Sequence, residues 1–156
     1  MRYLHCTIIF LIRNSHFDLY YLYSNTNRSA IASVNSDYIN TELAIETLTE
    51  ALKKEKPSNG ILLHSDQGVQ YTSWEFVNFC KDNGVIQSMS KAGYPYDNAP
   101  MERFYNTFKS CFYYRYTFES VEQLDEMTKQ YINWYNYVRP HSTNNYMTPM
   151  EFRYRA

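Results

Sequence analysis

The chain has 156 residues, and its 15 Lys and Arg against 16 Asp and Glu give a formal net charge of −1 at pH 7. This length suits one domain, and a 44% hydrophobic composition can bury a core, which excludes an intrinsically disordered chain. Three cysteines without a C-x-x-C pair support neither a disulfide framework nor a zinc ribbon, so we expect a reducing compartment. No stretch reaches the roughly 18 apolar residues needed to span a bilayer. Because the charge is near zero, any binding of nucleic acid must depend on a local patch or a bound metal.

The first third of the chain has the pattern of β-strands. Aromatic and β-branched runs at Tyr3–Ile12, Phe17–Tyr23 and Ala30–Val34 are separated by polar turn residues, which predicts an antiparallel meander of three strands. Apolar residues then recur at helical spacing after a cap at Asn40. We expect this helix to be about 14 residues long and to end before Pro57.

The middle of the chain alternates between short strands and helices. Ile61–Leu63 is a continuous apolar run directly after a helix, which is typical of a buried central strand. Ser73 caps a helix from Trp74 to about Asn83, and Val85–Ser88 is a further short strand. This order predicts an α/β fold with a mixed sheet.

Two more helices complete the prediction. Asp97 or Asn98 caps the first of them. A capping box of Ser120 with Gln123 starts the second, a long C-terminal helix that runs to about Tyr137 and is followed by a tail. The helices therefore flank the predicted sheet.

Two carboxylates, Asp66 and Glu102, lie at positions where catalytic residues are often found. Asp66 comes just past the predicted central strand, where α/β sheets place ligands, although Asp is also an ordinary turn former there. Glu102 lies in the first turn of a helix, where the macrodipole alone favours a carboxylate. The helix, strand and loop between them can return Glu102 toward Asp66. Paired carboxylates suit hard cations such as Mg²⁺ and two-metal phosphoryl transfer.

Five motifs extend this pair into a family pattern. They are His64 to Tyr71, Ser88 to Gly93, Asp97 to Glu102, Lys109, and Tyr135 to His141 followed by Thr148-Pro149. The chain resembles the integrase core of two-reading-frame bacterial insertion-sequence transposases, closely from about residue 60 to 152 and more weakly upstream. The resemblance implies an α/β, ribonuclease-H-like mixed sheet in a single domain over 1–152, with the first strands in 1–35 and the C-terminal helix and tail in 117–152.

The resemblance also implies an activity. Members of this family use a three-carboxylate (DDE) cluster with Mg²⁺ or Mn²⁺, as a two-ion site, to cleave DNA strands and transfer them. Asp66 and Glu102 match the second and third acids, and Lys109 matches a lysine that contacts DNA. We expect Lys91 and Arg103 to add to a local positive patch. The implied partners are DNA, as element ends and target, and a second copy or an intact transposase. No membrane contact is expected, and the implied location is the bacterial cytoplasm, at the nucleoid.

The first acid of the family is not evident. His5 stands where an aspartate is expected, and Asp18 on the next strand is the nearest alternative carboxylate. A neutral imidazole cannot replace an anionic ligand between two hard cations. The N-terminal DNA-binding segment of full-length relatives is also absent from the sequence. We therefore expect a truncated or decayed copy that is weakly active or inactive.

Other classes remain as alternatives. One is a noncatalytic DNA-binding or interaction remnant of a transposase, and another is a ribonuclease-H-type nuclease. We expect His64 to hydrogen-bond a loop and His141 to help dock the tail. Trp74 and Trp134 are interpreted as packing residues on their helices.

Overall fold

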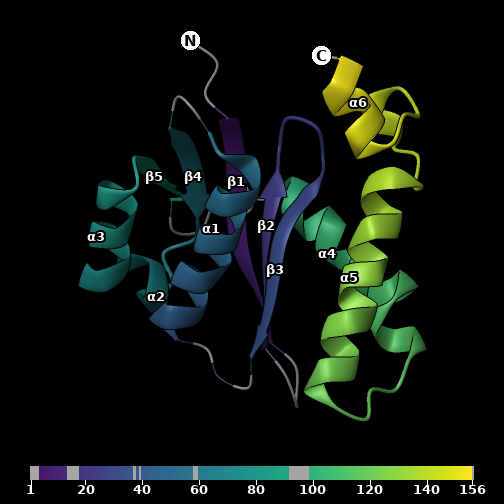
Figure 1. Cartoon of the computed structure of the whole chain (residues 1–156), viewed down its shortest axis with the longest axis horizontal. Coiled ribbons are helices and arrows are strands. Elements are labelled where there is room, and N and C mark those ends of the chain that lie inside the picture. Colours follow the sequence, from purple (N-terminus) through teal and green to yellow (C-terminus); the bar gives the residue numbers. More distant parts are fainter. Residues whose placement is uncertain are drawn as a thin grey trace.

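The protein is built on a five-stranded sheet in the order β3-β2-β1-β4-β5 (Figure 1). The structure, a computed structural model, describes residues 4–13, 18–36, 38, 40–57, 60–91 and 99–155. The strands are β1 (Leu4–Arg13), β2 (Asp18–Ser24), β3 (Ala30–Ser36), β4 (Ile61–Ser65) and β5 (Val85–Met89).

Strand direction makes the sheet mixed. β1 pairs with β2 and β2 with β3 in antiparallel fashion, which confirms the predicted meander. β4 is parallel to β1 on one side and to β5 on the other, so the carboxyl ends of β4 and β5 lie at one edge. The predicted mixed α/β sheet is confirmed.

Helices α1, α3 and α5 begin where the sequence places caps. The side chain of Asn40 accepts a hydrogen bond from the Leu43 N–H at 2.8 Å, and the Ser73 and Ser120 hydroxyls accept equivalent bonds at 3.2 Å. Two short helices, α2 and α6, were not predicted. The helices are α1 (Thr41–Glu55), α2 (Val69–Thr72), α3 (Trp74–Asp82), α4 (Ala99–Cys111), α5 (Val121–Tyr137) and α6 (Pro149–Arg155).

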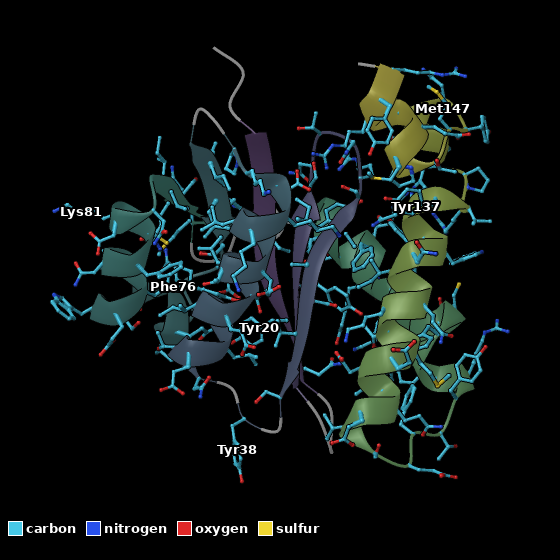
Figure 2. The ribbon with its side chains drawn as sticks, in the orientation of Figure 1. Tyr20, Tyr38, Phe76, Lys81, Tyr137 and Met147 are labelled. Carbon is cyan, nitrogen blue, oxygen red and sulfur yellow. The ribbon has the colours of Figure 1, made fainter. Side chains whose placement is uncertain are left out.

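The two faces of the sheet carry separate cores. On β2, the fully buried Tyr20 belongs to the core under α1, α2 and α3, and the fully buried Tyr21 belongs to the core under α4 and α5. This split follows from the two-residue period of a strand. Figure 1 shows α1 in front of the sheet, with α4 behind it. The labelled Tyr20 and Phe76 in Figure 2 belong to the α1 core, where Tyr71 has ring contacts with both.

The core on the α4 side is largely aromatic. The ring of Tyr21 lies 5.3 Å from that of Phe104 and 5.1 Å from that of Phe108. Phe108 in turn lies 5.1 Å from Tyr131 on α5. Edge-to-face geometry at these distances is favourable beyond simple burial. The aromatic composition therefore serves packing, and it fixes α4 across this face of the sheet.

One packing expectation is wrong. Trp74, the first residue of α3, keeps 77% of its surface exposed, because the inward face of this short helix is defined by Phe76 and Cys80. Trp134 keeps 40% exposure while its ring lies 5.6 Å from Tyr131, so it packs on one side only.

The end of α5 and the segment after it dock onto the turn between β2 and β3 and the start of β3. The Asn136 amide accepts from the Ala30 N–H at 2.9 Å and donates to the Ala30 carbonyl at 2.8 Å. Asn144 donates to the Asn27 carbonyl at 2.8 Å. His141 is buried against Tyr135, with ring centroids 4.7 Å apart, which confirms its expected role in docking the tail.

Candidate active site

Asp66 follows β4 directly, at the carboxyl edge that β4 shares with β5. Its side chain is exposed, and its Oδ1 accepts a hydrogen bond from the Gly68 N–H at 2.9 Å. The residue thus forms the turn that its sequence context suggested, and still presents a carboxylate to solvent. Burial raises the pKa of nearby Tyr71, and the Asp66 carboxylate adds to that effect.

Gly68 contributes space to this turn. Its φ of −57° is one that any residue can adopt, so no left-handed conformation is required. A β-carbon built there would lie 2.6 Å from the side chain of Gln70, which is itself buried. The glycine therefore lets α2 begin close behind Asp66.

His64 has a structural role. Its Nδ1 lies 3.1 Å from the Ser88 hydroxyl and its Nε2 lies 2.9 Å from the Ser90 hydroxyl. Both ring nitrogens are therefore engaged by β5 and the residue after it, as expected for a histidine that hydrogen-bonds a loop. The Ser90 N–H also donates to the Ser65 carbonyl at 2.9 Å. These bonds hold the ends of β4 and β5 together beside Asp66.

Glu102 lies in the first turn of α4 and is exposed. Its neighbour Met101 is buried in the core that α4 shares with Tyr21 and Tyr23. On β4, Ile61 and Leu63 belong to the opposite core. By strand alternation, Leu62 and His64 therefore point to the α4 side of the sheet. The side of β4 that carries His64 and the buried face of α4 therefore belong to the same face of the sheet.

The predicted basic residues take different positions. Lys109 lies in line with Glu102 along α4, because seven residues are close to two helical turns. Its ammonium stands 3.9 Å from the centre of the Tyr105 ring. Lys91 is exposed after β5, at the same edge as Asp66. Arg103 points to the other flank of α4, into a pocket with Arg28 and Arg139.

His5, the predicted position of the first acid, lies on β1, the strand next to β4. β1 pairs with β4 so that His5 is level with Leu62 and Thr7 with His64. Asp18, the alternative carboxylate, is on β2, paired with the last residue of β1. The side chains of His5 and Asp18, and the cap residues Asp97 and Asn98, lie outside the described part of the structure.

The described side chains do not assemble a complete metal site. Among them, no three His, Cys, Asp or Glu residues are grouped so that they could hold a metal ion. Asp66 and Glu102 supply the hard oxygen donors that Mg²⁺ prefers. Both ring nitrogens of His64 are already hydrogen-bonded to Ser88 and Ser90, so neither is free to bind a metal. The residues present therefore fit a divalent cation only in part.

Comparison with known families decides the assignment. A family model described as "Integrase core domain" matches residues 9–95, more than half of the chain. A second model with the same description matches residues 83–149. The chain belongs to the integrase core domain family. Between them, the two matched ranges contain Asp66, Glu102, Lys91, Arg103 and Lys109.

Curated relatives of this integrase core domain include transposases. The chain is 35% identical over 127 residues to the transposase for insertion sequence element IS904 from Lactococcus lactis, covering 81% of the chain and 50% of that protein. It is 39% identical over 106 residues to the putative transposase InsK for insertion sequence element IS150 from Escherichia coli, covering 68% of the chain and 38% of that protein. The chain therefore spans half or less of the length of these relatives.

Solved structures show the same fold. The HTLV-2 integrase catalytic core domain in complex with magnesium matches with a TM-score of 0.74 at 12% identity, covering 96% of both chains. A chain of the simian T-cell lymphotropic virus intasome matches with a TM-score of 0.80 at 16% identity, covering 96% of this chain and 54% of that one. The ribonuclease-H-like fold expected from the sequence is confirmed. No helix in the described residues is long and apolar enough to cross a membrane.

Proposed function

We propose that this chain is the core of an insertion-sequence transposase that acts on DNA, with Asp66 and Glu102 as its catalytic carboxylates. The observation that carries the proposal is the placement of Asp66, which is exposed at the carboxyl end of β4 in a fold of the integrase class. Glu102 supports it, because α4 crosses the sheet face to which His64 points. By the nature of this family, the reaction is phosphoryl transfer between DNA strands.

A divalent metal, Mg²⁺ or Mn²⁺, would supply activation of the attacking and leaving oxygens. Asp66 and Glu102 would hold it. The described residues provide no third anionic ligand, and a neutral histidine at position 5 does not replace one. We therefore propose weak activity for the wild-type chain. This shortage also favours the second candidate, a noncatalytic core that pairs with an intact transposase.

The remaining residues have roles in positioning within this proposal. The Gly68 N–H fixes one oxygen of Asp66, which leaves the rest of the carboxylate facing solvent. Lys109, held over Tyr105, and Lys91, at the Asp66 edge, would contact DNA phosphates. DNA as the partner, assembly with a second copy, and a place at the bacterial nucleoid all belong to the same proposal.

Nicking of a supercoiled plasmid in Mn²⁺ tests the catalytic assignment. We expect slow nicking by the wild-type chain and an increase of about tenfold in His5→Asp, because the variant restores an anionic ligand on the strand beside β4. Adding Asp66→Asn or Glu102→Gln to His5→Asp should abolish the gain. Glu75→Gln, an exposed carboxylate on α3, is the matched control and should retain it.

Two results would count against the proposal. Nicking that is unaffected by Asp66→Asn would remove Asp66 from the chemistry. Absence of any gain in His5→Asp, with the fold intact by circular dichroism, would show that position 5 is not the missing ligand and would favour the noncatalytic candidate.

A further inference from the structure

A second concave site lies on the flank of α4 that faces away from Glu102 and Lys109. It is a pocket of about 550 Å³ between the β2–β3 turn, α4 and the segment after α5. Arg103 is next to Glu102 in sequence, and one residue corresponds to 100° around a helix. The pocket and Glu102 therefore lie on different sides of the same helix.

The charge of this pocket is uncompensated. Arg28, Arg103 and Arg139 line it, and its lining contains no Asp or Glu. The ion pairs found among the described residues involve none of these three arginines. Three guanidinium groups around one concave surface repel each other unless an anion lies between them.

Neighbouring groups hold this charge in place and do not neutralise it. Arg139 Nη1 lies 3.1 Å from His141 Nε2 and 3.3 Å from its Nδ1, and the guanidinium stands over the Tyr135 ring. Burial, followed by the charge of Arg139, lowers the pKa of His141 to about 4, so the imidazole is neutral at pH 7. Burial raises the pKa of Tyr23, whereas the charges of Arg28 and Arg139 act against that rise.

The backbone conformation of Arg28 is a second, independent indication that this pocket is a binding site. Its φ is 64°, in the left-handed region, where a non-glycine residue costs on the order of 1 kcal/mol. Its side chain bonds to Asn25 at 3.4 Å and also interacts with the Tyr23 hydroxyl, from a position that glycine or asparagine would fill with less strain. Strained backbone is enriched at functional sites, which makes Arg28 a candidate contact residue.

We propose that this pocket binds a backbone phosphate of a DNA strand that also reaches the Glu102 flank of α4. The inference rests on the proposed function. Planar guanidinium donors match phosphate oxygens in pairs, and a volume of this size accepts a nucleotide. At the rim, Tyr146 keeps 77% exposure and offers a ring on which a base can stack.

Fluorescence anisotropy with a labelled DNA oligonucleotide tests this site, using the full chain in EDTA so that no metal chemistry contributes. Arg103→Gln and Arg28→Gln should each weaken binding about fivefold to tenfold and lower the salt slope by about one. Lys81→Gln removes the same charge from α3, on the opposite side of the molecule from Tyr137 on α5 (Figure 2), and should change binding less than about twofold.

The outcomes separate this site from the catalytic proposal. Arginine variants that bind DNA like Lys81→Gln, with unchanged melting temperatures, would overturn the phosphate site even if Asp66-dependent nicking persists. Arginine-dependent binding without any nicking would support the site and count against the catalysis. Tighter arginine-dependent binding of a polyglutamate peptide than of DNA would also overturn it, in favour of an acidic protein partner.

Discussion

The Asn136 side chain offers a sharp test of how α5 is held to the sheet. It lies on α5 with 4% exposure, and its amide pairs with both backbone groups of Ala30, which is 1% exposed at the start of β3. Asn136→Ala removes both bonds at once. The Ala30 N–H and carbonyl then lose their partners in a place that water does not reach.

The expected loss of stability follows from the two backbone groups that lose their hydrogen bonds. A buried backbone group left without a partner costs about 1 to 3 kcal/mol, so two such groups cost about 2 to 6 kcal/mol. Alanine is the better helix former by about 0.5 kcal/mol, which offsets a small part. We expect a net loss of about 1.5 to 5.5 kcal/mol, which corresponds to a fall in Tm of roughly 3 to 20 °C for a chain of this size.

Urea unfolding followed by circular dichroism measures this loss. Asn133→Ala is the matched control, because Asn133 is exposed one turn earlier on the same helix. The control should change stability by less than about 0.5 kcal/mol. Equal midpoints for the two variants would refute the reasoning, since they would show that the Asn136 amide contributes no more than a solvated side chain.

Three further predictions concern the tail and the cysteines. Burial lowers the pKa of His141 to about 4 in the folded chain, whereas the unfolded chain takes up a proton on His141 near pH 6.5. The free energy of unfolding should therefore fall as the pH drops from about 6.5 to about 4. Over the same pH range, the urea midpoint of His141→Gln should fall less than that of the wild-type chain. Arg153→Gln should destabilise the protein by about 3 kcal/mol, because the Glu55 side chain, 4% exposed, loses its partner; thermal melting that matches wild type would contradict this. Burial raises the pKa of the Cys80 thiol to about 12, so iodoacetamide should modify the exposed Cys111 before Cys80. Peptide mapping that finds Cys80 labelled in the folded chain would contradict the burial of this side chain.

Much of the fold could be predicted from local signals. Asn40, Ser73 and Ser120 cap the helices that the sequence assigned to them, because a cap bonds to a backbone N–H only three residues away. Helices α2 and α6 were missed, because segments of four and seven residues carry too few turns to show a helical period.

The candidate site was predictable only in part. The residue pattern identified Asp66 and Glu102, and strand order explains why Asp66 stands at an open edge of the sheet. It also singled out Lys109 and Arg103 as one positive patch, whereas their positions on α4 direct them to different flanks. A helix has only 3.6 residues per turn, so residues that are close in sequence can serve separate surfaces.

The sequence by itself determined the types of the main elements, the family and the two candidate carboxylates. Caps, periodicity and motifs depend on residues that are close together in the chain, so they can be recognised without the structure. Only the tertiary structure decided that Asn136 clamps Ala30, 106 residues away, and that Arg28 meets Arg139 in one pocket. Such meetings depend on how a whole helix packs against a whole sheet. Local sequence patterns do not predict that packing. A cationic pocket whose residues come from distant segments can therefore be recognised only in the folded structure.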